Sequence, residues 1–172
     1  GSEGALENVI FIEKTLSEAG IRHFRDKWEE NTPAGKILFQ NIIARIDGSN
    51  SDSFVVLGAH YDTKKLDHFL NFTGANDGAS GVAILLEIAR NLSKEKIKKT
   101  LELVFFDGEE CLYSYSETDG LHGSKRYVKN LKDSGRKRRC EAVVIADMLA
   151  DRKLNAVIPA GCDPFLAAKF LK

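Results

Sequence analysis

The sequence predicts an α/β fold in which a mixed, largely parallel central sheet is flanked by helices. Three short, mostly apolar runs carry this prediction: Phe54–Ala59, Leu101–Phe106 and Glu141–Ala146. Runs of this length and composition are typical of strands buried on both faces of a parallel sheet. Amphipathic segments separate them, and each run ends directly before polar residues. Because ligand sites of open α/β sheets lie at the carboxyl ends of strands, those polar residues form the candidate site.

Length and composition indicate one domain and exclude several classes of partner. The chain has 172 residues, of which 43% are apolar, enough for one sizeable core. Lys plus Arg and Asp plus Glu both number 25, so no net field attracts nucleic acid or an anionic membrane. No apolar run is long enough to span a membrane. The three cysteines lack the spacing of a zinc finger or a disulfide framework.

The first elements in chain order are scaffold. A helix is expected from Glu3 to about Ala19, with Ser2 as its N-cap. Two strands follow, 21–30 and Lys36–Ile46, and the turn between them predicts a hairpin at the edge of the sheet. A polar turn over Asp47–Asp52 then leads into the strand Phe54–Ala59.

That strand ends at His60, and Asp62 follows two residues later. This spacing lets the carboxylate hold one ring nitrogen while the other binds a metal ion. A histidine at a strand end is more often a structural residue, so the pair is weak evidence on its own.

A glycine-rich segment, Gly74–Gly81, contains Asp77 and precedes a helix that is expected to end near Leu92. Asp77 could cap this helix or bind a metal ion. The metal alternative requires a sharp backbone turn, which the neighbouring glycines permit.

The strand Leu101–Phe106 leads directly into Asp107, Glu109 and Glu110. Carboxylates this close repel one another unless their pKa values rise or a cation lies among them. Two alternatives are compatible with this stretch. One is a metal site with a general base beside it, and the other is a solvated acidic turn after a core strand. The metal alternative requires the strand to end by Gly108, since adjacent strand residues point to opposite faces.

The remaining segments are a spacer, Cys111–Gly120, and a helix from Ser124 to about Lys132. The third buried strand follows and ends before Asp147. A short strand over Asp151–Ile158 and a helix from Pro164 are expected to complete the chain.

Four candidate ligands, His60, Asp77, Glu110 and Asp147, are therefore expected at one edge of one sheet. Nitrogen and oxygen donors in this mixture suit zinc, and a bridging carboxylate suits two zinc ions about 3.5 to 4 Å apart. Glu109, next to a ligand, is free to act as a general base.

Five segments of the chain resemble the M28 metallopeptidase family, which also contains the glutaminyl cyclases. They are GAHYDT, GANDGASGVAILLEIA, FFDGEE, LHGS and DMLADRKLN, in the family's order. The resemblance implies a three-layer, zinc exopeptidase-like sandwich over one catalytic domain, residues 1–172. It also implies one zinc ion bound by His60, Asp77 and Asp147, and a second that shares Asp77 with Glu110. Glu109 would be the general base, and Asp62 the partner of His60.

One departure from the family concerns a further histidine for the second zinc, which family members take from well beyond the Asp147 segment. This chain ends at Lys172 without it, so we expect the sequence to be an incomplete copy at its C-terminal end. The family resemblance also implies a secreted or periplasmic protein.

The family resemblance, together with this set of residues, implies three alternative functions. The first is a zinc aminopeptidase that removes N-terminal residues from peptides through a metal-activated water. The second is a glutaminyl-peptide cyclotransferase that forms N-terminal pyroglutamate, with the N-terminus of a peptide again as substrate. The third, motivated by the absent histidine, is a non-catalytic domain that keeps the fold and a metal ion.

Overall fold

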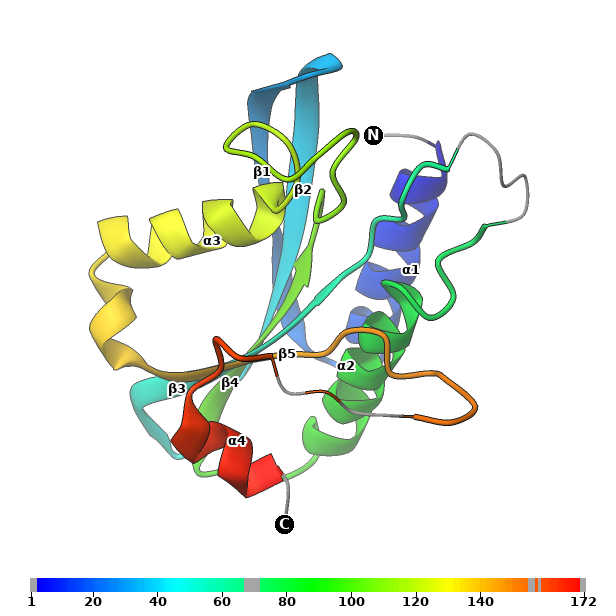
Figure 1. Ribbon diagram of the computed structural model, residues 1–172. Helices are drawn as coiled ribbons and strands as arrows, with labels where there is room; N and C mark the ends of the chain where they lie inside the picture. Colours follow the sequence, from blue (N-terminus) through cyan, green and yellow to red (C-terminus); the bar gives the residue numbers. More distant parts are fainter. Residues whose placement is uncertain (1–2, 67–71, 155–156, 158, 171–172) are drawn as a thin grey trace.

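The structure, a computed structural model, describes residues 3–66, 72–154, 157 and 159–170. A five-stranded sheet in the order β1-β2-β4-β3-β5 forms its centre (Figure 1). The strands are β1 (Arg22–Thr32), β2 (Gly35–Ile46), β3 (Asn50–His60), β4 (Lys99–Phe106) and β5 (Cys140–Ile145). β1 and β2 form an antiparallel hairpin at one edge, and β2 pairs antiparallel with β4. β3 pairs in parallel with both β4 and β5, so the predicted mixed sheet is confirmed.

Helices cover both faces of this sheet. On one face, α1 (Glu3–Glu18) and α2 (Ala79–Leu92) pack on the larger apolar cluster; on the other, α3 (His122–Asp133) packs on a smaller one. A 3-10 turn, η1 (Arg136–Arg139), leads into β5, and α4 (Pro164–Phe170) follows the last loop. The three layers confirm the predicted sandwich (Figure 1). None of the helices in the described residues is long and apolar enough to cross a membrane.

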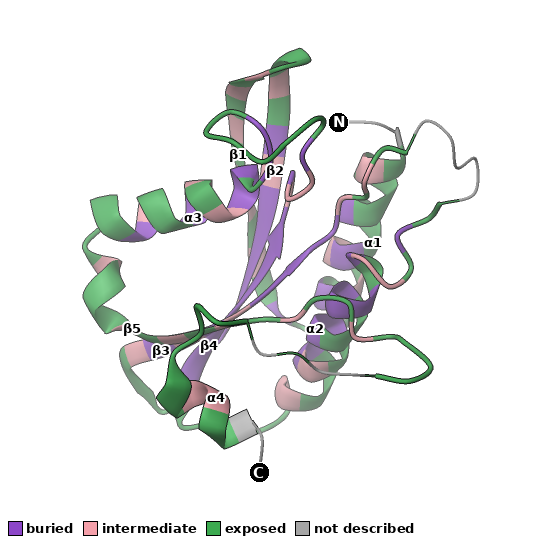
Figure 2. Cartoon of the chain, in the orientation of Figure 1, coloured by how far each residue is buried: buried purple, intermediate pink, exposed green. Residues whose placement is uncertain are grey.

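The apolar patterns explain how these layers form. In α2, the buried residues Val82, Leu85, Leu86 and Ala89 follow the spacing of a single helix face. β4 is buried along almost its whole length, because it lies between β2 and β3 in the middle of the sheet (Figure 2). This central position accounts for the uninterrupted apolar run in its sequence.

β5 differs from the prediction of a strand buried on both faces. Its residues alternate between half-buried and exposed, and Val143 and Ile145 are 50% and 54% exposed. Its place at the edge of the sheet accounts for this exposure. An apolar sequence alone does not distinguish an edge strand from a central one.

Several element boundaries also differ from the expected ones. β3 begins at Asn50, inside the predicted polar turn, and α3 begins at His122 rather than after Ser124. The N-cap of α3 is Leu121, which has a positive φ of 57°. The short strand expected over 151–158 is absent from residues 151–154 and 157; residues 155, 156 and 158, like the expected cap Ser2, lie outside the described residues.

Candidate metal centre

The three parallel strands end next to one another, and this places the candidate residues at one edge of the sheet. His60, the last residue of β3, pairs with Phe106 at the end of β4. On the other side of β3, Gly58 pairs with Ile145 at the end of β5. The polar segments that follow these strands therefore begin close together in space.

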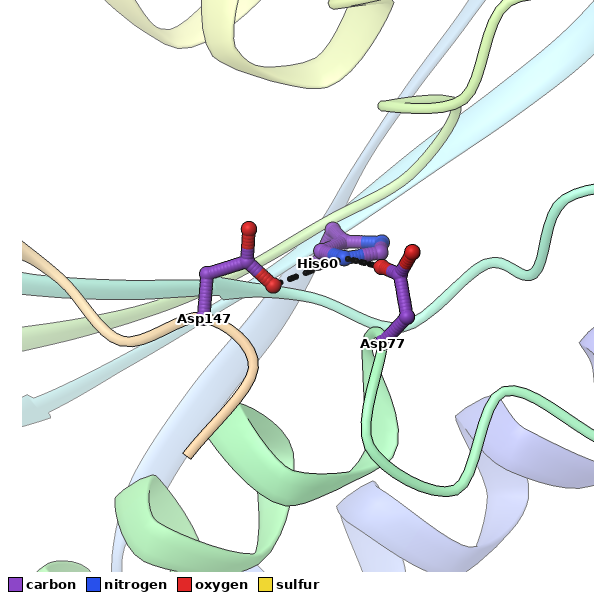
Figure 3. Close-up of side chains that lie close together, drawn as sticks. All are labelled: His60, Asp77 and Asp147. Carbon is purple, nitrogen blue, oxygen red and sulfur yellow. Dashed lines mark ion pairs between the residues drawn. The ribbon is translucent and has the colours of Figure 1, made fainter. Parts of the chain in front are cut away.

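His60, Asp77 and Asp147 form the centre of this edge, and their side chains point toward one another (Figure 3). His60 Nε2 lies 3.0 Å from Asp77 Oδ1 and 3.5 Å from Asp147 Oδ1. One ligand atom from each residue lies within 4.8 Å of the other two, a separation that one metal ion can span. Three of the four predicted ligands thus come together.

The imidazole of His60 supports the presence of a cation at this point. The side chain is buried, and neither ring nitrogen has a hydrogen bond of good geometry among the described residues. Burial alone would lower the pKa of His60, but the carboxylates of Asp62, Glu109 and Asp147 raise it to about 9. A buried nitrogen that faces carboxylate oxygens rather than a hydrogen-bond partner fits a zinc ligand, and this donor set suits zinc.

The turn before α2 aims Asp77 at His60. Gly78, not Asp77, occupies the N-cap of α2, so the capping alternative for Asp77 is wrong. Gly78 has a φ of 95°, and a Cβ there would lie 2.9 Å from the carbonyl oxygen of Asp62 and 3.1 Å from His60 Cε1. Only glycine fits this position comfortably, and the turn leaves the Asp77 carboxylate free to face the imidazole.

Asp62 connects His60 to the acidic segment after β4. Its Oδ1 lies 3.5 Å from His60 Nδ1, and its two oxygens accept the backbone N–H groups of Glu109 and Glu110 at 3.0 Å each. Burial would raise the pKa of Asp62, but His60 and these two N–H groups hold it below its usual value. Asp62 therefore remains ionised and fixes the backbone that carries both glutamates.

Glu109 lies half-buried beside this centre and is suited to proton transfer. β4 ends at Phe106, and Gly108 has a φ of 64°, so the strand ends where the metal alternative required. Burial raises the pKa of Glu109; His60 opposes this effect, and Glu110 and Asp62 add to it. The Tyr115 hydroxyl lies 3.3 Å from Glu109 Oε2. A carboxylate with a raised pKa is a better general base near neutral pH.

Glu110, the fourth predicted ligand, does not join the group of three. Its Oε2 lies 3.6 Å from Lys64 Nζ and 3.5 Å from the Tyr115 hydroxyl. Its pKa is raised by burial and by the negative charge of Asp77, which shows that the two carboxylates influence each other. Glu110 thus lies next to the centre with a lysine as its charge partner.

Sequence reasoning missed the residues that shape the loops around this centre. Asp119 is buried and accepts the backbone N–H groups of Leu112, Tyr113 and Ser114, which folds the spacer back on itself. Burial would raise the pKa of Asp119, but these N–H groups hold it below its ordinary value. The pair Asp119-Gly120 at the end of the spacer is a turn signal in the sequence, and it could have indicated this fold-back.

A cavity of about 700 Å³ lies beside the acidic segment. Its lining includes Asp62, Glu110, Cys111, Phe39 and His122, and it reaches the first turn of α1. His122 is buried there and stacks on Phe39, with 4.4 Å between the ring centroids. The cavity leaves open space next to Glu110.

Comparison with known proteins assigns the family. The model of peptidase family M28 matches residues 41–165. A glutaminyl-peptide cyclotransferase of Drosophila melanogaster is 35% identical over 120 residues, 67% of this chain and 33% of its own length. A glutaminyl-peptide cyclotransferase-like protein of Bos taurus is 36% identical over 144 residues, 78% of this chain and 37% of its own.

Solved structures give the same result. The glutaminyl cyclase of an Acidobacteriales bacterium superposes with a TM-score of 0.91 at 34% identity, over 98% of this chain and 58% of that one. A Zn-dependent exopeptidase of Parabacteroides distasonis superposes with a TM-score of 0.70 at 25% identity, over 87% of this chain and 55% of that one.

The matches to the two curated relatives cover 33% and 37% of their lengths, so the chain spans about a third of each relative. The match to the family model covers all the candidate residues described above, and the chain belongs to peptidase family M28.

Proposed function

We propose that this chain is part of a glutaminyl-peptide cyclotransferase, which converts an N-terminal glutamine of a peptide to pyroglutamate. The observation that carries the proposal is the likeness to a solved glutaminyl cyclase, at a TM-score of 0.91 over 98% of the chain. The two curated relatives described above, at 35% and 36% identity, support the same activity. They favour the cyclase over the aminopeptidase that the sequence analysis placed first.

The residues His60, Asp77 and Asp147 would hold the metal ion of this centre. The orphaned nitrogen of His60 and the two carboxylate oxygens around it fit zinc. When bound, zinc supplies a Lewis acid that polarises the γ-carbonyl of the glutamine.

Glu109 would move the proton that cyclisation requires. The α-amino nitrogen bonds to the γ-carbonyl carbon, the bond from that carbon to the amide nitrogen breaks, and ammonia leaves. Glu109 takes a proton from the attacking amine and returns it to the departing nitrogen. Its half-buried position and raised pKa suit both transfers. The Tyr115 hydroxyl donates a hydrogen bond to this carboxylate, 3.3 Å from Oε2.

The aminopeptidase remains the second candidate, because the Zn-dependent exopeptidase of Parabacteroides distasonis shares the fold at a TM-score of 0.70. The same Glu109 would then take its proton from water instead of an amine. The two reactions differ in whether water reaches the carbonyl carbon.

Mass spectrometry of a peptide with an N-terminal glutamine separates these functions. We expect the zinc-loaded protein to release ammonia without shortening the peptide. The Glu109→Gln variant should lose roughly a hundredfold or more in rate, since a general base contributes about that much. Glu117→Gln is the matched control, because Glu117 is an exposed carboxylate in the spacer that follows Glu109 and Glu110. This variant should keep the rate. Loss of the first residue would instead identify an aminopeptidase, and no reaction would identify a non-catalytic domain.

A further inference from the structure

The loop that carries Asp147 is attached to the start of α2 by two hydrogen bonds. The backbone N–H of Leu149 donates to Ser80 Oγ at 2.9 Å, and the backbone N–H of Ala150 donates to Asn76 Oδ1 at 2.7 Å. Asn76 directly precedes Asp77 in the chain, and Ser80 lies three residues after Asp77. The two segments that supply Asp77 and Asp147 are therefore joined by side chains that are not themselves metal ligands.

Asn76 and Ser80 also support each other. Ser80 Oγ donates to the backbone carbonyl of Asn76 at 2.5 Å, and the Ser80 side chain is buried. Its hydroxyl thus bonds to both segments at once. The pair forms a clamp between the turn before α2 and the loop after β5, which we call the Asn76–Ser80 clamp.

The backbone around this clamp leaves no free space. A Cβ at Gly81 would lie 2.2 Å from the carbonyl oxygen of Ala146 and 2.9 Å from the Cβ of Ala59. The N–H of Ala146 donates to the carbonyl of Gly58 at 2.8 Å. The start of α2, the end of β3 and the residue before Asp147 thus touch directly, so a shift of the loop moves Asp147 relative to Asp77 and His60.

The loop itself is under local strain. Met148, the residue after Asp147, has a φ of 52°, a conformation that residues with side chains rarely adopt. Such a conformation persists only when surrounding contacts hold it. Leu149 and Ala150, the next two residues, are the ones bonded to Ser80 and Asn76.

Asp147 depends on this loop for its position. Among the described residues, the polar contact of its half-exposed side chain is the one with His60. Asp77 Oδ1 and Asp147 Oδ1 both approach His60 Nε2, so the two carboxylates lie close together and their like charges repel each other. Hydrogen bonds between the two segments oppose that repulsion and keep the ligands in place for a metal ion.

We infer that Asn76 and Ser80 are positioning residues that set the separation of Asp77 and Asp147 and thereby the zinc affinity of the centre. This inference rests on the metal centre in the proposed function. It assigns a role to two side chains that touch neither substrate nor metal. Residues that orient metal ligands commonly change affinity by roughly ten- to a hundredfold when they are removed.

Zinc titration of the 172-residue chain tests this role, with a competing chromophoric chelator as the reporter. We expect Asn76→Ala and Ser80→Ala each to raise the dissociation constant for zinc by roughly tenfold or more. Asn91→Ala and Ser93→Ala are matched controls, since these residues bond to backbone carbonyls of Glu87 and Arg90 at the far end of α2. The controls should bind zinc as the unchanged chain does.

Thermal melting of the metal-free variants separates positioning from simple stabilisation. The inference predicts that Asn76→Ala and Ser80→Ala lose zinc affinity. Their metal-free melting temperatures should fall no further than those of the control variants. A lower melting temperature with an unchanged dissociation constant would overturn it and leave only a structural role. Asn76 is only half-buried, so Asn76→Ala carries the test if Ser80→Ala does not fold.

His60→Ala distinguishes failure of the clamp from failure of the centre. If the unchanged chain binds zinc no better than His60→Ala, the proposed metal centre is wrong and the clamp has no ligand to position. If His60→Ala loses zinc while Asn76→Ala and Ser80→Ala keep it, the centre stands and the inference about the clamp alone is overturned.

Discussion

At the scale of single residues, the candidate centre concentrates negative charge in a partly buried place. Asp62, Asp77, Glu109 and Glu110 surround His60. The pKa values of His60, Asp62, Glu109 and Glu110 reflect how that charge is balanced. Asp62 stays ionised because His60 and backbone N–H groups support its charge. For Glu109 and Glu110 the effect of burial exceeds that of the nearby cations, so their pKa values rise.

Asp107 provides a pH test of this environment. Burial raises its pKa from 3.8 to about 6, with Asp62 adding to the effect. Between about pH 4 and 6, Asp107 therefore binds more protons in the folded chain than in the unfolded chain, so its contribution to stability falls as the pH rises. The loss amounts to at most about 3 kcal/mol. We expect urea denaturation of the chelator-treated chain to show this slope.

The Asp107→Asn variant should remove most of the slope, because an amide oxygen can still accept the N–H of Gln40 without carrying a charge. Asp151→Asn, an exposed position, is the control and should keep it. An unchanged slope in Asp107→Asn would show that another group titrates.

Tyr115 provides a second test at this scale. Its hydroxyl lies 3.3 Å and 3.5 Å from the Glu109 carboxylate oxygens and 3.5 Å from Glu110 Oε2. Tyr115→Phe keeps the ring and removes the hydroxyl. We expect kcat for a glutaminyl peptide to fall roughly tenfold, the low end for a hydrogen bond to a charged group. Tyr113→Phe, a more exposed tyrosine of the same spacer, should keep kcat; equal values for both variants would exclude a role for the hydroxyl.

At the scale of elements, close backbone contact joins α2 to the ends of β3 and β5. Gly81→Ala tests this contact, since its Cβ would lie 2.2 Å from the Ala146 carbonyl oxygen. We expect a loss of roughly 1 to 3 kcal/mol in the free energy of unfolding, as for overpacked positions. Gly4→Ala in α1 is the control, because no atom lies within 4 Å of its Cβ and alanine favours a helix. Equal stabilities of the two variants would contradict the contact.

One side chain, that of Asp119, accepts three backbone N–H groups of the spacer after β4. Asp119→Ala removes the acceptor of three backbone N–H groups, so we expect the amides of residues 112–114 to exchange faster with deuterium. Glu117→Ala, in the same spacer, should leave that exchange unchanged. Slow exchange in Asp119→Ala would show that other contacts hold the spacer.

At the scale of the whole molecule, the layered fold and the edge that carries the site followed from apolar runs that end in polar residues. His60, Asp77 and Asp147 could be predicted because strand ends and glycine-rich turns have local sequence signals. The exposure of β5 could not, because it depends on where the strand lies in the sheet. The positions of Lys64 and Tyr115 beside Glu110 depend on loop conformation, for which the sequence offers no periodic signal.

X-ray absorption spectroscopy at the zinc edge of the zinc-loaded chain tests the central claim most directly. The chain holds three free cysteines, Cys111, Cys140 and Cys162, which offer sulfur ligands elsewhere. We predict a first coordination shell of nitrogen and oxygen only, at about 2.0 to 2.2 Å, that is lost in Asp147→Ala. Sulfur at about 2.3 Å, or a spectrum unchanged by Asp147→Ala, would contradict a centre built from His60, Asp77 and Asp147.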